Sequence, residues 1–333
     1  MTVTKKTQSE NLIPFPESHE RNPGIPLELE KIHAIRINRS AVERRAGTLG
    51  TRRTVKKQWQ AAWLLKAVSC IDLTTLAGDD TPGNVIRLCA KGKRPVRKDL
   101  LENLGLAELD LKVGAICVYH NLVETAVSHL KGSSIPVAAV STGFPAGQIS
   151  FQQKLKEIEA SVMAGASEID IVISRNLVLT GKWNQLYEEV AAFRKACGHA
   201  HMKTILATGE LATLTNVARA SQVCMMAGAD FIKTSTGKES VNATLPVSLV
   251  MVRAIRQYYE KTGYRVGFKP AGGIRKAKQS LEWLFLIKEE LGEAWLDPSL
   301  FRFGASGLLG DIERQLEHFL TGRYSASYRH PMG

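Results

Sequence analysis

The sequence predicts an α/β protein, a (β/α)8 TIM barrel with an N-terminal helical extension. Eight short apolar segments recur along the chain, and amphipathic helical patterns separate them. Strands that alternate with helices form parallel sheets through right-handed crossovers. Eight such units in about 250 residues favour a closed barrel over an open doubly wound sheet. No glycine-rich dinucleotide fingerprint follows the first predicted strand, which also argues against the open sheet.

The predicted elements divide the chain into four parts. Residues 1–28 are rich in proline and polar groups and are predicted to form a mobile tail. A helical pattern over 29–66 predicts an extension packed on the barrel, residues 67–323 form the barrel, and 324–333 form a C-terminal tail. The predicted strands are 67–73, 115–119, 137–141, 169–173, 204–207, 231–234, 266–269 and 301–304.

Helices are predicted between these strands from their apolar spacing. Trp183, Leu186, Val190 and Phe193 repeat at the interval that places one apolar stripe against a sheet. Similar stripes cover 151–162 and 214–225, and a glycine follows each of these two stripes as a C-terminal stop.

Composition excludes several classes of protein. The 333 residues are 44% hydrophobic and 23% charged, which is too apolar for global disorder. No segment approaches the roughly 18 apolar residues that a membrane span needs. The five cysteines are widely spread without a C-x-x-C pair, so neither a disulfide framework nor a zinc site is expected. The N-terminus has no apolar signal region, so we expect a cytoplasmic protein, with a nuclear pool left open.

The formal charge of +12 favours anionic partners such as phosphorylated metabolites. Half of this excess lies in residues 1–60, which hold twelve Lys and Arg against six Asp and Glu. A solvated helix face explains this basic segment best, because apolar residues interrupt the charges. Association with nucleic acid or RNA granules through the segment is the alternative, and it would be steeply salt-sensitive.

Three charged residues are predicted to enter one apolar interior. Alternation along the strands directs Lys233, Lys269 and Asp170 inward, because apolar residues occupy the opposite faces. A buried lysine is either ion-paired or has a lowered pKa, and a second cation nearby lowers that pKa further. The neutral amine attacks a carbonyl and forms a Schiff base. From spacing alone, the alternative that both lysines only pair with Asp170 and Glu168 stays open.

Glycine-rich turns follow the last three predicted strands, where barrels commonly bind phosphate. Their backbone N–H groups can hold a phosphate, and nearby Lys238 and Arg275 add positive charge. The candidate substrate-binding residues in these turns are Thr236, Gly237, Lys238, Gly272, Gly273, Arg275, Gly304 and Ser306.

Several motifs resemble deoxyribose-phosphate aldolase, a class I aldolase. They are FIKTSTGK (231–238), VGFKPAGG (266–273), IDLTTL (71–76) and EIDIV (168–172), and the likeness extends over residues 50–325. VLTGKW (178–183) and the long basic N-terminal segment are most similar to the animal-type members. The resemblance implies a lyase that reversibly cleaves 2-deoxy-D-ribose 5-phosphate to acetaldehyde and D-glyceraldehyde 3-phosphate in deoxyribonucleoside catabolism. It implies no metal and no organic cofactor.

The resemblance also implies a role for each matching position. Lys233 forms the Schiff base, Lys269 lowers its pKa, Asp170 relays protons, and Asp72 orients the relay. Cys117 lines the acetaldehyde pocket, and the glycine-rich turns surround the 5-phosphate. Lys203 and the histidines near 200 are expected at the opposite end of the barrel, outside the site.

The chain departs from the family pattern at two positions. Gly307 follows Ser306 where many members have a second hydroxyl residue, and His120 stands where proline is common. The roles of Tyr324 and Tyr328 in the C-terminal tail stay open.

Two other hypotheses and the assembly of the chain remain open. One alternative is a different phosphate-binding barrel enzyme, either another Schiff-base aldolase or a sugar-phosphate isomerase, although an isomerase does not need two interior lysines. The other is a barrel without enzymatic activity that binds RNA or an acidic partner. The expected partners are a small sugar phosphate and aldehydes, and a homodimer is left open.

Overall fold

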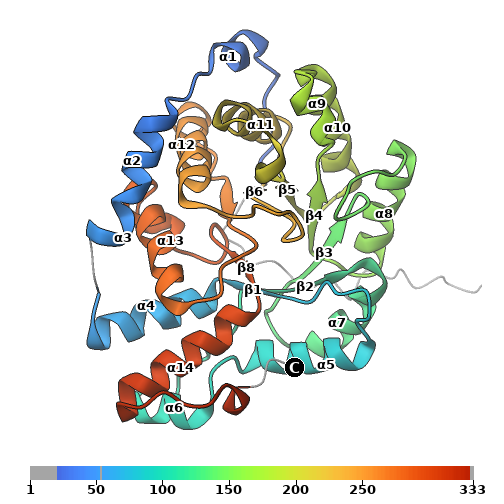
Figure 1. Ribbon diagram of the computed structural model, residues 1–333. Helices are drawn as coiled ribbons and strands as arrows, with labels where there is room; N and C mark the ends of the chain where they lie inside the picture. The colour runs from blue at the N-terminus through green and yellow to red at the C-terminus, as the bar shows by residue number, and fades with distance from the viewer. Residues whose placement is uncertain (1–20, 53–54, 331–333) are drawn as a thin grey trace, which may run out of the picture.

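The computed structural model describes residues 21–52 and 55–330 as a closed parallel barrel (Figure 1). Its strands are β1 (Ile71–Thr74), β2 (Ala115–Tyr119), β3 (Val137–Ser141), β4 (Glu168–Val172), β5 (His201–Ile205), β6 (Phe231–Lys233), β7 (Gly267–Lys269) and β8 (Phe303–Ala305). All pairs are parallel, in the order β7-β6-β5-β4-β3-β2-β1-β8. Bridges from Phe268 to Phe301 and from Ala271 to Gly304 join the two ends of that order. The predicted (β/α)8 barrel is confirmed.

Helices surround the barrel on its outside (Figure 1). They are α5 (Pro82–Lys93), α6 (Lys98–Asn103), α7 (Val123–Leu130), α8 (Phe151–Met163), α9 (Arg175–Leu179), α10 (Trp183–Ala196), α11 (Leu214–Met226), α12 (Leu245–Thr262), α13 (Ala277–Glu290) and α14 (Gly307–Thr321). The stripes predicted at 151–162, 183–193 and 214–225 correspond to α8, α10 and α11. The first predicted strand began too early, because residues 67–69 belong to the preceding helix, α4 (Lys57–Ser69).

Capping side chains explain where several helices begin. Thr81, Ser150, Thr213 and Thr244 precede α5, α8, α11 and α12, and each side-chain oxygen accepts a hydrogen bond from a backbone N–H of the first turn. Such a cap contributes about 1 kcal/mol to stability. At the other end of α12, Gly263 has a φ of 77°, which residues with a Cβ rarely adopt. These local signals place the crossovers that bring each strand back to the sheet.

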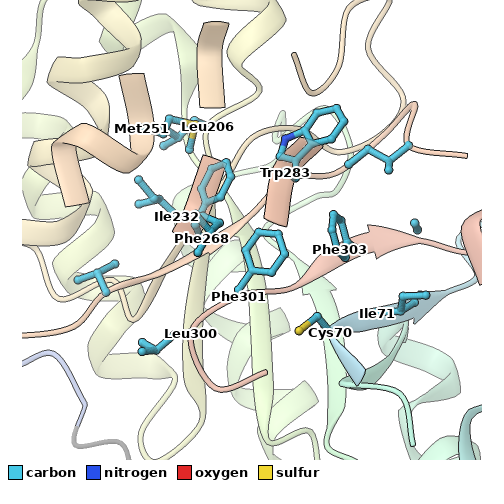
Figure 2. Packing of buried hydrophobic residues seen from close by; sticks show 14 of the residues in the cluster. Cys70, Ile71, Leu206, Ile232, Met251, Phe268, Trp283, Leu300, Phe301 and Phe303 are labelled. Carbon is cyan, nitrogen blue, oxygen red and sulfur yellow. The ribbon is translucent and has the colours of Figure 1, made fainter. Parts of the chain in front are cut away.

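The outward faces of the strands pack against the helices. Ile232 of β6 and Phe268 of β7 belong to one apolar cluster with Met251 of α12 and Trp283 of α13 (Figure 2). The rings of Phe268 and Phe301 stack with their centroids 6.4 Å apart. Because side chains alternate along a strand, the neighbours of Ile232 and Phe268 face the interior of the barrel.

The N-terminal extension is helical, as predicted, and in the structure it contacts helices of the barrel. It contains α1 (Leu29–Ala34), α2 (Arg39–Gly47) and α3 (Leu49–Arg52) before α4. Arg45 of α2 forms ion pairs with Glu289 and Glu290 at the end of α13, at 2.6 and 3.3 Å. The helix α2 also lies along α12 (Figure 1).

The predicted mobile tail extends too far toward the C-terminus. Asn22 is buried: its side-chain amide donates to the carbonyls of Met225 and Ala229, at 2.8 and 3.0 Å, and its Oδ1 accepts from Tyr258 at 2.9 Å. These bonds satisfy carbonyls in the last turn of α11 and just after it, and they hold residues 21–28 on the barrel. Residues 1–20, the rest of the predicted tail, lie outside the described residues.

The C-terminal segment packs against α14 as far as residue 330. His330 is buried, with its Nε2 3.1 Å from Glu317, and Arg329 pairs with Glu317 at 3.0 Å. Tyr324 stacks on His318 with ring centroids 4.1 Å apart, and Tyr328 is 82% exposed. Neither tyrosine faces the barrel interior here. Residues 331–333 lie outside the described residues.

Within residues 21–52 and 55–330, no helix has the length and apolar character needed to cross a membrane. Nor do His, Cys, Asp and Glu side chains there form a group of three suited to a metal ion.

Gly267 allows β7 to approach the interior ring of Phe231. A Cβ added at Gly267 would lie 2.4 to 2.5 Å from atoms of that ring. We expect Gly267→Ala to lower the free energy of unfolding by about 1–3 kcal/mol, because the ring must move inside a packed core. Gly47→Ala is the control, since a Cβ there meets nothing within 4 Å. Equal stability of both variants in denaturant unfolding would contradict this packing.

Candidate active site

Lys233 and Lys269 lie side by side in the barrel interior. They end β6 and β7, and the parallel register pairs them directly. Lys233 is 3% exposed and Lys269 is 0% exposed. Ile232 and Phe268 lie in the outer apolar layer (Figure 2). Because side chains alternate along a strand, Lys233 and Lys269 point to the interior. The structure therefore brings together the two lysines that the sequence predicted to share one interior.

Asp170 of β4 joins the two lysines across the barrel. Its Oδ2 lies 2.7 Å from the Nζ of Lys233 and 2.8 Å from the Nζ of Lys269, so the two nitrogens share one carboxylate oxygen. Asp170 is fully buried. Burial alone would raise its pKa, but the ammonium groups of Lys203, Lys233 and Lys269 outweigh burial and hold the pKa of Asp170 well below its usual range.

Asp72 of β1 holds Lys269 from the other side. Its Oδ2 lies 2.5 Å from the Nζ of Lys269, and its Oδ1 lies 2.6 Å from Nη1 of Arg302. Lys269 therefore touches two carboxylates, whereas Lys233 touches one. This difference gives the two neighbouring lysines different proton affinities.

A second layer of charges lies deeper in the same interior. Arg302 donates from Nη2 to Glu168 at 2.9 Å, and Lys203 contacts both Glu168 and the Oδ1 of Asp170, the latter at 3.3 Å. All three side chains are buried. Glu168 thus pairs with Arg302 and Lys203, and the alternative in which it neutralises Lys233 or Lys269 is not what the structure shows.

The prediction that Lys203 lies outside the site was wrong. Strand β5 begins at His201, earlier than expected, and its register with β4 pairs Lys203 with Asp170. Arg302 was missed altogether. Its position between Phe301 and Phe303, both packed in the outer apolar cluster, is the alternation signal that indicates an inward side chain.

The pKa values of the two lysines are shifted in opposite directions. Burial lowers the pKa of Lys233, and the charge of Lys269 lowers it further against the opposing effect of Asp170. Burial also acts to lower the pKa of Lys269, but the carboxylates of Asp170 and Asp72 outweigh it and raise that pKa. Lys233 is therefore the amine that most readily becomes neutral.

The counts of opposite charges in this interior differ by one. Four cationic side chains contact three carboxylates, namely Lys203, Lys233, Lys269 and Arg302 with Asp72, Glu168 and Asp170. An unmatched charge in a buried cluster is costly. Loss of one proton balances the cluster, and Lys233 is the least strongly held of the three lysines by this geometry.

Apolar side chains form one wall beside the charged cluster. Cys117 of β2 packs with Ala138 and Val140 of β3, separately from the outer apolar layer. Cys117 is fully buried, and burial raises the pKa of its thiol. A protonated thiol among small apolar groups lines the site and does not act as a nucleophile. His120 lies in a turn after β2, where its Nδ1 is 3.0 Å from the Ser161 hydroxyl.

The predicted phosphate-binding turns meet at the C-terminal ends of β6, β7 and β8. Gly237, Gly272 and Gly273 all have positive φ, between 81° and 87°, and Lys238 and Arg275 are exposed. The hydroxyl of Ser306 donates to the carbonyl of Thr74 at the end of β1. A contact role for these residues toward phosphate stays a prediction.

Three of the predicted phosphate-binding residues already have defined structural neighbours. A Cβ added at Gly304 would lie 2.7 Å from the Cβ of Ala271 and 3.3 Å from the Cε of Lys269, so this glycine leaves room for both side chains. The backbone N–H groups of Thr236 and Gly237 donate to the carboxylate of Glu239. Glu239 was not identified from the sequence, where it follows the glycine-lysine pair without a motif of its own.

The arrangement has the parts that Schiff-base chemistry needs. Lys233, with its lowered pKa, supplies the amine. Asp170 contacts this amine, Lys269 contacts the same oxygen of Asp170, and the two groups can move protons. The site lies at the C-terminal ends of the strands, where barrel enzymes carry out their chemistry.

Comparisons with known proteins agree with this geometry. Residues 66–289 match the model of the DeoC/LacD family aldolases. The chain is 61% identical over 313 residues to the human protein named deoxyribose-phosphate aldolase, which covers 93% of this chain and 98% of that protein. The mouse protein of the same name is 62% identical over 311 residues, with the same coverage.

Solved structures show the same fold at lower identity. A deoxyribose-phosphate aldolase from Aeropyrum pernix, described as tetrameric, has a TM-score of 0.57 and 20% identity, covering 84% of this chain and 99% of that one. A putative deoxyribose-phosphate aldolase from Coccidioides immitis has a TM-score of 0.61 and 22% identity, covering 84% and 98%. The family model and the human and mouse relatives extend the likeness from the fold to the sequence. The chain belongs to the DeoC/LacD family of aldolases.

Proposed function

We propose that the protein is a class I aldolase that reversibly cleaves 2-deoxy-D-ribose 5-phosphate to acetaldehyde and D-glyceraldehyde 3-phosphate. One observation carries the proposal: Lys233 and Lys269 share the Oδ2 of Asp170 inside a cluster with one cation too many. The names of the human and mouse relatives support the same substrate.

The proposed reaction begins at the amine of Lys233. The neutral Nζ adds to the C1 aldehyde of the open-chain sugar, and loss of water gives an iminium ion. The hydroxyl on C3 then loses its proton, the bond between C2 and C3 breaks, and its electron pair forms an enamine with C1 and the nitrogen. Glyceraldehyde 3-phosphate departs. Protonation at C2 and hydrolysis release acetaldehyde and return the free amine.

The neighbouring charges supply the protons for these steps. Asp170 touches both lysine nitrogens, so it can pass a proton between the reacting centre and Lys269. Lys269 stays cationic because it is held between Asp170 and Asp72. Asp72 orients Lys269 and is itself fixed by Arg302. The apolar wall at Cys117 fits the small acetaldehyde-derived group.

The other hypotheses explain fewer of the unusual residues. A sugar-phosphate isomerase centres on a carboxylate base and does not need two interior lysines that share one carboxylate. A homodimer, association of the basic N-terminal segment with nucleic acid or RNA granules, and a cytoplasmic location with a nuclear pool all stay predictions. Salt-sensitive RNA binding that survives Lys233→Ala would identify a separate binding function.

Chemical trapping tests the Schiff base directly. We expect incubation with acetaldehyde and borohydride to place an ethyl group on Lys233, as found by peptide mass spectrometry, because its amine has a lowered pKa. Lys233→Ala should lose this adduct, whereas Lys154→Met, which removes a buried lysine of α8, should keep it. Adducts confined to exposed lysines would count against the mechanism.

The pH dependence of activity tests the role of Lys269. The rate needs neutral Lys233, so it rises as the pH passes through the pKa of that amine. Lys269→Met removes the neighbouring positive charge and leaves the Oδ2 of Asp170 to Lys233, and both changes raise the pKa of Lys233. We expect the acid limb of the kcat/KM profile to move up by about one pH unit or more. An unmoved limb, equal to that of Lys154→Met, would contradict this role.

A further inference from the structure

Glu239 is a buried carboxylate among the predicted phosphate-binding groups. It lies two residues after Gly237 and is 9% exposed. Its Oε1 accepts from the N–H of Thr236 at 3.0 Å, and its Oε2 accepts from the N–H of Thr236 and of Gly237, both at 3.1 Å. The Oε2 also accepts from the hydroxyl of Thr236 at 2.8 Å. A carboxylate thus occupies the position where backbone N–H groups of this turn bind an anion.

The same carboxylate fixes the path of the turn. The Thr236 hydroxyl, which donates to Glu239, accepts from the N–H of Lys238 at 3.1 Å. The hydrogen bond between Thr236 and Glu239 therefore fixes the direction of the backbone at Lys238. Without the carboxylate, Gly237, with a φ of 87°, has no side chain that could hold this conformation.

The turn after β6 is also attached to the glycine pair after β7. The side chain of Asn242 donates to the backbone carbonyl of Glu239 at 2.9 Å, and a Cβ added at Gly272 would lie 2.6 Å from the Cγ of Asn242. The N–H of Ala243 donates to the carbonyl of Ala271 at 3.3 Å. The position of Glu239 therefore affects both turns.

We propose that Glu239 is a positioning residue for the phosphate end of the substrate. Its carboxylate holds the Thr236–Gly237 turn and so orients Lys238 toward the phosphate. It also occupies the backbone N–H groups of Thr236 and Gly237, which the phosphate therefore does not bind. The substrate phosphate is then held by Lys238 and by the turns that contain Gly272, Gly273 and Ser306. This inference rests on the proposed function, because it assigns a part of the same site.

Chemistry favours a fixed carboxylate over one that phosphate displaces. Hydrogen bonds from N–H and O–H donors to an ionised acceptor are stronger than neutral ones, and here three donors from Thr236 and Gly237 bind the carboxylate of Glu239. A phosphate on the same amides would have to expel the carboxylate into solvent or lie against it, and two like charges in contact repel each other.

Kinetics with and without the phosphate group test the proposal. We expect Glu239→Ala to raise the KM for 2-deoxyribose 5-phosphate about tenfold, with kcat within about twofold, because the charge-assisted hydrogen bonds that orient the turn are lost. The kcat/KM for unphosphorylated 2-deoxyribose should stay unchanged. Glu239→Gln keeps one carbonyl oxygen and should recover part of the effect. Glu159→Ala, an exposed site on α8 with the same change in net charge, is the control.

Amide hydrogen exchange provides a readout that does not require activity. Exchange at Thr236 and Gly237 should become at least about tenfold faster in Glu239→Ala, and inorganic phosphate should leave it unchanged in the unsubstituted protein. A lower KM or tighter phosphate binding in Glu239→Ala would show that the carboxylate competes with phosphate, which overturns the proposal. An equal loss with both substrates would overturn it too. Failure of the aldolase proposal is distinguishable, because the unsubstituted protein would then cleave neither sugar.

Discussion

The site depends on a shortage of negative charge in a dry interior. Three carboxylates and four cationic side chains meet inside the barrel, and every one of these side chains is buried. Water cannot stabilise an extra charge there, so the cluster is most stable when one lysine is neutral. The geometry selects Lys233, because Lys269 is held by two carboxylates and Lys233 by one that it must share. The buried cluster of charges therefore both fills the barrel interior and activates the amine of Lys233.

The barrel was predictable because its signals are local and repeated. Alternation placed Lys233, Lys269 and Asp170 inside, and the structure confirms all three positions. Lys203 was misplaced because the start of β5 was set by apolar residues, whereas the strand begins at His201 and carries its charge into the interior. A strand end that carries a charged residue gives a weak sequence signal, because the charged side chain is buried only when partners on other strands neutralise it. For Lys203 these partners are Asp170 and Glu168.

The tail boundary and Glu239 illustrate what a single sequence does not contain. Asn22 looks like an ordinary loop residue, and only the folded chain brings it to the carbonyls at the C-terminal end of α11. Glu239 follows a glycine-rich turn whose amides suggested a phosphate site, yet its own carboxylate binds those amides. A backbone N–H group can bind a carboxylate of the same chain as well as a phosphate of the substrate. The spacing of residues in the sequence does not tell which of the two it binds. The resemblance to the aldolase family indicated the chemistry before either detail was visible.

The charge state of Lys233 is the quantity on which the account depends. It can be measured by nitrogen-15 NMR titration of the lysine side chains in the unsubstituted protein, with the signal assigned by its absence in Lys233→Ala. We expect Lys233 to lose its proton below about pH 10.4, the pKa of an unperturbed lysine, while Lys269 remains charged over the same range. A Lys233 that titrates at or above that value would contradict activation by the buried charge cluster.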